Sequence, residues 1–192
     1  LSPDRTIKIG SPMFEVLNYS LRKINKSSIL NKLKIEKENY FLVSCHREEN
    51  IDSDKNFNNL ISLLNLLAEK YELPIIVSVH PRTQKIINEK KPNLSKLINL
   101  HTPFGFNDYN FLQINSFVVL SDSGTISEES SILNFKAINI RESHERPEAM
   151  EEAAVIMAGL NSERVIQGIE ALKNQKVGEK RNLNLVKDYS IN

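Results

Sequence analysis

The sequence predicts an α/β fold, in which a doubly wound parallel sheet carries helices on both faces. From Tyr40 onward, short apolar runs alternate with amphipathic segments, as in repeated strand–helix units. The runs are rich in Val, Ile and Leu, which is typical of strands buried on both faces. Polar residues follow four of these runs, and in such folds the strand ends are where ligands bind.

Composition narrows the class of protein. The 192 residues are 40% hydrophobic and 26% charged with a net charge of +1, as in an ordinary one-domain globular protein. No charge run suggests a nucleic-acid partner, no apolar stretch is long enough to cross a membrane, and no leader resembles a signal peptide. The single cysteine, Cys45, forbids an internal disulfide and fits a reducing cytoplasm.

The first residues predict a strand and a helix that stand apart from the sheet. Thr6 to Gly10 reads as an isolated strand, and Met13 to Leu33 reads as one long helix behind Pro12. The break at Lys34 to Asn39 separates this helix from the sheet. We expect the chain to be cut from something longer, since it starts at Leu1 without Met and its last pattern stops before a helix is completed.

Six strands and the helices between them follow from periodicity. Phe57, Leu60, Ile61 and Leu64 recur at helical spacing within Lys55 to Lys70, and Val165, Ile166, Ile169 and Leu172 do so in the last helix. The predicted strands are Tyr40 to Cys45, Pro74 to Val79, Leu97 to His101, Phe117 to Leu120, Lys136 to Ile140 and Ala154 to Met157.

The turn after the fourth strand is a candidate anion site. Asp122-Ser123-Gly124-Thr125 joins this strand to a helix, whose first N–H groups have no internal partner and carry partial positive charge. Gly124 lets the backbone approach an anion closely. Glu129, one turn further on, could accept hydrogen bonds from a sugar attached to a phosphate. The alternative is an ordinary helix capped by Asp122 or Ser123, with the glutamates balancing the helix dipole.

Basic residues at the other strand ends fit the same ligand. His46 to Asn50 follows the first strand, His80 the second, and Arg141 to Glu148 the fifth. Arginine, histidine and backbone N–H groups are suitable donors for a diphosphate, which Ser123, Gly124, His46 and Arg146 would supply. The alternative is a set of solvated loop side chains with a surface ion pair at Arg146.

An aromatic residue is needed to lie against a nucleotide base. Tyr109 and Phe106 are the candidates, in a segment that otherwise reads as a helix start capped by Asn107 or Asp108 with its rings packed inward. No metal site is predicted, because the four histidines are scattered and Cys45 has no sulfur partner.

Four ordered motifs resemble the non-hydrolysing UDP-N-acetylglucosamine 2-epimerases: His46 to Asn50, Val79 to Arg82, Asp122 to Glu129 and Glu145 to Glu148. That family has two Rossmann-like domains in a GT-B-like arrangement, and this chain resembles the second. The resemblance implies three parts: an interdomain segment at 1–39, a UDP-binding domain at 40–175 and the truncated start of a C-terminal crossover at 176–192.

The resemblance also implies roles for single residues. Ser123 and Gly124 would hold the diphosphate, with His46 and Arg146 as catalytic residues beside it. Glu129 would bind the ribose and Tyr109 would lie against uracil. The remaining members of the implied UDP site are Thr125, Arg47 and His80.

The family's reaction inverts C2 of the sugar by anti elimination of UDP and its re-addition, without a cofactor. Its proton-transferring carboxylates lie mainly in the first domain, so this chain alone would be an inactive part of an isomerase. The resemblance implies a cytoplasmic bacterial homodimer that acts in polysaccharide biosynthesis. The alternatives are half of a GT-B glycosyltransferase and a non-catalytic UDP-sugar-binding module.

Two positions depart from the commonest family pattern. Thr125 stands where that pattern has a second glycine, and Ser127 where it has a glutamine. This departure resembles the branch that makes UDP-N-acetylfucosamine from a 6-deoxy-talose sugar nucleotide for capsule or O-antigen.

Overall fold

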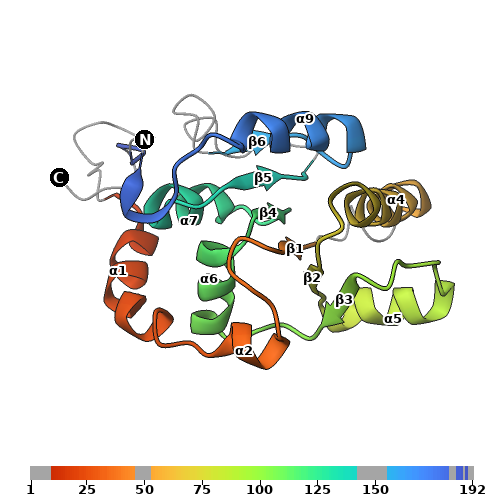
Figure 1. Ribbon diagram of the computed structural model, residues 1–192, viewed down its shortest axis with the longest axis horizontal. Coiled ribbons are helices and arrows are strands. Elements are labelled where there is room, and N and C mark those ends of the chain that lie inside the picture. Colours follow the sequence, from red (N-terminus) through yellow and green to blue (C-terminus); the bar gives the residue numbers. More distant parts are fainter. Residues whose placement is uncertain (1–9, 46–52, 142–154, 182–184, 188, 190–192) are drawn as a thin grey trace, which may run out of the picture.

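The strands form one parallel sheet in the order β3-β2-β1-β4-β5-β6 (Figure 1). The computed structural model describes residues 10–45, 53–141, 155–181, 185–187 and 189. The strands are β1 (Phe41–Ser44), β2 (Ile75–Ser78), β3 (Ile98–His101), β4 (Val118–Ser121), β5 (Ala137–Asn139) and β6 (Ile156–Met157). Five of them fall within a predicted strand, and β4 extends one residue beyond the predicted end at Leu120. The strand order confirms the doubly wound parallel sheet.

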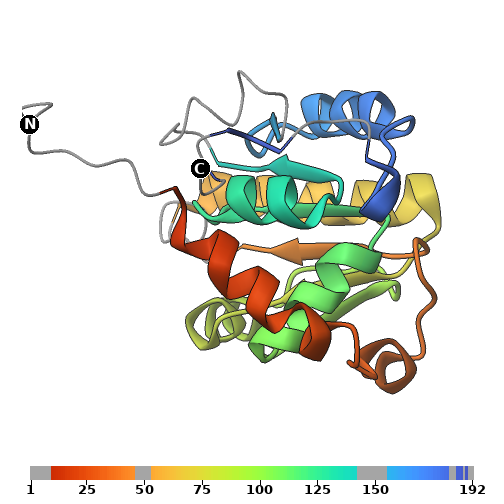
Figure 2. The same ribbon diagram turned by 90° about the vertical axis from the view of Figure 1, so that its left-hand side faces the viewer.

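Helices cover both faces of the sheet. One face carries α4, α5 and α9, and the other carries α6 and α7, with α1 packed against both of the latter (Figures 1 and 2). Among the described residues, no helix has both the length and the apolar character that crossing a membrane requires. The helices are α1 (Pro12–Ile24), α2 (Ile29–Leu33), α4 (Asp54–Tyr71), α5 (Pro81–Lys90), α6 (Phe106–Asn115), α7 (Ile126–Leu133) and α9 (Ser162–Leu172), followed by the short 3-10 helix η2 (Gly178–Lys180).

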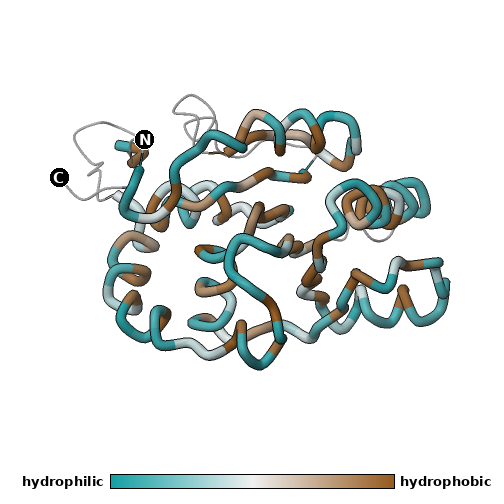
Figure 3. The backbone as a smooth tube through the Cα atoms, in the orientation of Figure 1, coloured by the Kyte–Doolittle hydropathy of each residue, from teal (hydrophilic) through white to brown (hydrophobic). Residues whose placement is uncertain are grey.

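The central strands are apolar up to their last residue because they contribute side chains to two cores. In β1, Phe41 and Val43 join the core under α4 and α9, while Leu42 joins the core under α6 and α7. Both cores are built from strand residues that are almost fully buried. In Figure 3 the largely apolar strands accordingly run through the middle of the molecule, between helices in which hydrophilic and hydrophobic residues alternate.

The prediction of one helix over Met13 to Leu33 was wrong, because α1 ends at Ile24 and α2 starts at Ile29. Ser27 lies between the two helices and interrupts the predicted single helix. Its hydroxyl accepts a hydrogen bond from the Ile29 N–H at 3.2 Å and donates one to Asp108 on α6 at 2.5 Å. A serine hydroxyl competes with the helical backbone for hydrogen bonds. Here Asp108, which lies 81 positions away in the sequence, also holds Ser27 in its non-helical conformation.

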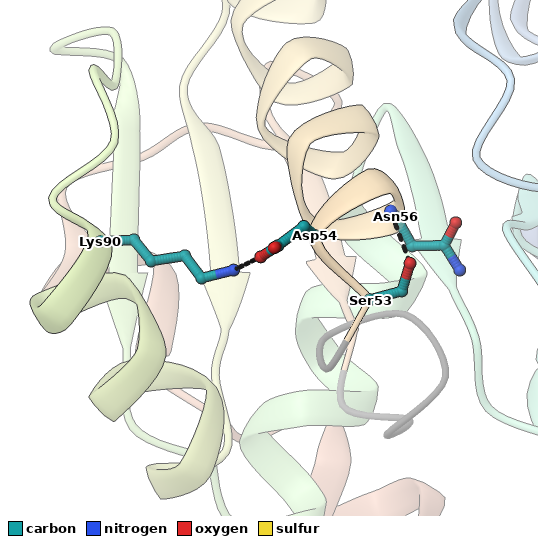
Figure 4. A network of polar contacts seen from close by, with 4 residues as sticks. All are labelled: Ser53, Asp54, Asn56 and Lys90. Atoms are coloured by element: carbon teal, nitrogen blue, oxygen red, sulfur yellow. Dashed lines mark hydrogen bonds and ion pairs between the residues drawn. The ribbon is translucent and has the colours of Figure 1, made fainter.

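The start of α4 is tied to the end of α5. The Ser53 side chain caps α4 by accepting from the Asn56 N–H at 3.4 Å, and Asp54 pairs with Lys90 (Figure 4). The Lys90 ammonium group holds the pKa of the Asp54 carboxyl below its usual range. Since this pair is exposed, it contributes little to stability, and its effect is to keep the ends of two neighbouring helices together.

We predict that Phe41→Ala lowers the free energy of unfolding by about 3–5 kcal/mol, because the ring is fully buried. Its centroid lies 5.3 Å from those of both Tyr71 and Phe117, in edge-to-face contacts that alanine cannot make. Urea denaturation measures the change. Phe106→Ala is the matched control, because that ring is 44% exposed, and we expect it to cost about 1 kcal/mol or less. Equal losses for the two variants would contradict the prediction.

Candidate functional site

The carboxyl edge of the sheet is a row of polar side chains. The row before it is apolar, with Val43 of β1 in register with Val77 of β2 and Leu120 of β4. One residue later the strands change character together, and the aligned residues are His101, Ser78, Ser44, Ser121 and Asn139. The ends of the predicted strands therefore lie along one edge, as the sequence predicted.

The order of the strands reverses between β1 and β4. From β1 the chain continues outward to β2 and β3, whereas β4 leads to β5 and β6 on the other side. In doubly wound sheets, ligands bind in the crevice outside the strand ends at this position. Ser44 and Ser121, which are register partners, mark it in this chain.

Tyr109 reaches this point from α6. Its phenol lies near Ser44 and Ser121, the register partners at the ends of β1 and β4, and its half-buried ring packs against the core under α6 and α7. Burial raises the pKa of the Tyr109 phenol well above its usual value, and the negative charge of Glu129 raises it further. The hydroxyl is therefore a neutral group near the ends of the two central strands.

The other aromatic candidate, Phe106, is the first residue of α6. Gly105 is the N-cap of this helix, so the alternative in which Asn107 or Asp108 caps it was wrong. Phe106 is 44% exposed, and its ring does not pack inward as that alternative expected.

The turn after β4 is held by its own hydroxyl groups. Ser121 Oγ accepts from the Ser123 N–H at 3.1 Å, and Ser123 Oγ accepts from the Thr125 N–H at 3.3 Å. The N-cap of α7 is Thr125, and its side chain makes no capping hydrogen bond. The alternative in which Asp122 or Ser123 caps the helix was therefore wrong.

Three N–H groups at this turn have no acceptor among the residues that the structure describes. The first hydrogen bond into α7 runs from the Glu129 N–H to the Thr125 carbonyl at 2.9 Å. Within the described part of the chain, no hydrogen bond uses the backbone N–H of Gly124, Ile126 or Ser127. Unpaired donors at the positive end of a helix form a site that suits an anion.

The two glutamates of α7 have different surroundings. Glu128 is buried and accepts a hydrogen bond from Ser11, the N-cap of α1, so that it fastens α1 to α7. Glu129 is half-buried. Its Oε1 accepts from Thr125 Oγ1 at 2.7 Å, and its Oε2 accepts from Gln113 Nε2 at 2.5 Å. The sequence did not point to Gln113, because it lies 16 residues before its partner on another helix.

His80 lies at the same edge, just beyond β2. It is exposed and is the N-cap of α5, where its Nδ1 accepts from the Arg82 N–H at 3.4 Å. The other predicted residues, His46, Arg47 and Arg146, lie outside the described residues. Within the described ranges, no three His, Cys, Asp or Glu side chains gather closely enough to hold a metal ion.

Comparison with known proteins identifies relatives of the chain. The family model for UDP-N-acetylglucosamine 2-epimerase matches residues 1–190. A UDP-N-acetylglucosamine 2-epimerase from Methanocaldococcus jannaschii is 35% identical over 156 residues, which are 79% of this chain and 42% of the relative. One from Methanococcus maripaludis is 32% identical over 90% of this chain and 49% of its own length. The chain thus spans about half the length of these curated relatives.

Solved structures show the same similarity. The structure of UDP-N-acetylglucosamine 2-epimerase from Rickettsia bellii is 43% identical, has a TM-score of 0.83, and is matched over 94% of this chain and 48% of its own. The Methanocaldococcus jannaschii enzyme in complex with UDP-GlcNAc and UDP is 29% identical, with a TM-score of 0.85, over 97% of this chain and 52% of its own.

We predict that Tyr109→Phe makes stability less sensitive to alkaline pH. The folded state raises the pKa of this phenol above its value in the unfolded chain. The contribution of Tyr109 to stability is therefore complete below about pH 10. Above that pH the unfolded chain loses the phenol proton before the folded chain does, and the contribution declines. Urea denaturation between pH 8 and pH 11.5 should show a loss that is shallower in the variant, by up to about 1.4 kcal/mol per pH unit. Identical slopes in the two proteins would contradict the burial of this hydroxyl.

Proposed function

Because the chain belongs to the UDP-N-acetylglucosamine 2-epimerase family, we propose that it provides the UDP-binding half of an enzyme that inverts C2 of a UDP-N-acetylhexosamine. The observation that carries this proposal is the turn before α7. There, three N–H groups without an acceptor among the described residues stand next to the Glu129 carboxylate, which Thr125 and Gln113 hold. A diphosphate and a ribose need these two kinds of partner side by side. The relative from Methanocaldococcus jannaschii, whose structure is in complex with UDP-GlcNAc and UDP, supports this choice of ligand.

Each part of the nucleotide has a proposed partner. The diphosphate lies against the turn of Ser123, Gly124 and Thr125, and Glu129 accepts from the ribose hydroxyls. Tyr109 and the exposed ring of Phe106 stand on α6, on the uracil side of the site. Basic side chains from neighbouring strand ends, namely His46, Arg47, His80 and Arg146, complete the site around the phosphates.

The proposed chemistry of this half is electrostatic. UDP leaves C1 of the sugar and later returns to it, and the departing diphosphate carries negative charge. Donors that are already oriented toward that charge stabilise the transition state, which is the role we assign to the α7 N-terminus, His46 and Arg146. We assign the carboxylates that move the C2 proton to an amino-terminal domain beyond this chain, in a cytoplasmic homodimer without a cofactor.

The sugar has a second candidate. Thr125, in place of the glycine that the commonest family pattern carries, favours the 6-deoxy-talose sugar nucleotide of the UDP-N-acetylfucosamine branch, which supplies capsule or O-antigen. UDP-N-acetylglucosamine remains the first candidate, because the relatives are named for it.

We predict that the chain binds UDP and that Glu129→Ala weakens this binding about tenfold or more, because hydrogen bonds to a carboxylate are lost. Arg146→Ala should weaken it by a similar factor through the diphosphate. Isothermal titration calorimetry with UDP, and with ADP as the control, measures both effects. Arg164→Ala is a matched control on the exposed face of α9 and should leave the affinity unchanged. Absent binding of UDP, or equal binding of UDP and ADP, would reject the UDP site.

We also predict that the reading frame upstream of the Leu1 codon encodes a second Rossmann-like domain, and that the complete product inverts C2 of a UDP-sugar. Incubation with UDP-GlcNAc in deuterium oxide, without an acceptor, should give the C2 epimer with deuterium at C2, since the proton is removed and replaced. A parallel incubation uses the 6-deoxy-talose sugar nucleotide. Transfer of sugar only when an acceptor is present would indicate a glycosyltransferase, and a reading frame that starts at Leu1 would indicate a binding module.

A further inference from the structure

Glu129 is held on both of its oxygens before any ligand arrives. Thr125, one helical turn earlier, donates to Oε1 at 2.7 Å, and Gln113 on α6 donates to Oε2 at 2.5 Å. A carboxylate has about four acceptor positions, two on each oxygen. Among the described residues, these two donors leave one acceptor position free on each oxygen.

The direction of each hydrogen bond is determined by the groups involved. An ionised carboxylate only accepts, so the NH₂ side of the Gln113 amide must face Glu129 and its carbonyl oxygen must point away. A hydroxyl carries a single hydrogen, and that of Thr125 goes to Glu129. The contact of 2.9 Å between Ser123 Oγ and Thr125 Oγ1 is therefore donated by Ser123. Glu129 is in this way connected to the phosphate-facing turn.

Gln113 makes this contact at a cost to the fold. The residue is fully buried, and its Oε1 has no hydrogen-bond partner in the part of the chain that the structure describes. A buried acceptor without a partner is unfavourable and calls for an explanation. An apolar side chain of the same length would fill this position without leaving such an atom. The feature that Gln113 provides and an apolar residue lacks is the donor to Glu129.

We propose that Gln113 and Thr125 are positioning residues that orient the Glu129 carboxylate for the two vicinal hydroxyls of a ribose. This inference rests on the proposed UDP-binding function and assigns the residues that give that site its selectivity for a ribonucleotide. The two free acceptor positions, one on each oxygen, match the two O–H donors of a vicinal diol. Because the carboxylate is already oriented, binding does not have to order it.

The test compares UDP with its 2′,3′-dideoxy analogue, which lacks both hydroxyls. In Gln113→Met, an unbranched apolar side chain replaces the amide and keeps the interior filled. Calorimetry should show UDP binding weakened about tenfold or more, while binding of the analogue changes by less than about twofold. The melting temperature should not fall, since the buried acceptor without a partner is removed as well. Gln167→Met, at an exposed position on α9, is the matched control and should change nothing.

Thr125 is tested in the same way. Thr125→Val keeps the branched shape but removes the hydroxyl, and should lower the preference for UDP over the analogue. Thr125→Ser restores the hydroxyl and should restore the preference. This pair of variants decides the question if Gln113→Met does not fold.

The outcomes separate this inference from the proposed function. If the unaltered chain binds UDP no more tightly than the analogue, the ribose role of Glu129 is wrong, and the positioning role falls with it. If the unaltered chain prefers UDP and Gln113→Met keeps that preference, Gln113 does not position Glu129, although the UDP site stands. If Gln113→Met lowers the affinity for UDP and for the analogue equally, Gln113 has a packing role only, and the inference is overturned.

Discussion

A parallel sheet that is covered on both faces leaves its strand ends as the place where polar groups of the strands can meet a ligand. In this chain β1, β2, β4 and β5 are apolar up to their last residue, and there Ser44, Ser78, Ser121 and Asn139 stand in one row. Burial on both faces forces the apolar residues inward, and the common direction of the strands brings all the polar ends to one edge. The site follows from these two constraints, because each of its described residues lies at or just beyond that edge, or is held by a residue that does.

Two helices on one face of the sheet, α6 and α7, supply different groups to the site. The start of α7 and the turn before it supply N–H groups that have no acceptor among the described residues, and α7 also supplies Glu129. α6 supplies Tyr109, which lies near the ends of β1 and β4, and Gln113, which holds Glu129. α1 supports this pair from outside, since Ser11 at its start bonds to Glu128. The neighbouring glutamates of α7 thus have different roles. Glu128 packs two helices together, and Glu129 takes part in the proposed binding of a ligand.

The strands were predictable because their signal is local. A strand buried on both faces is a short run of Val, Ile and Leu, and a run such as Phe41 to Ser44 shows this in its own residues. The long helix from Met13 to Leu33 failed for the opposite reason, because Ser27 is held outside a helix by Asp108, far along the chain. The capping of α7 by Asp122 or Ser123 failed because Ser121 and Ser123 use their hydroxyls within the turn itself.

By itself, the sequence determined the fold class, the edge at which polar groups gather, the turn of Ser123 and Gly124, and a resemblance specific enough to name a family. These depend on residue type and order along the chain, which are visible without coordinates. Only the tertiary structure decided that Glu128 binds Ser11 of α1, that the Tyr109 phenol lies near the ends of β1 and β4, and that Gln113 holds Glu129. Such pairings join residues on different elements, and their geometry exists only once the helices have packed on the sheet.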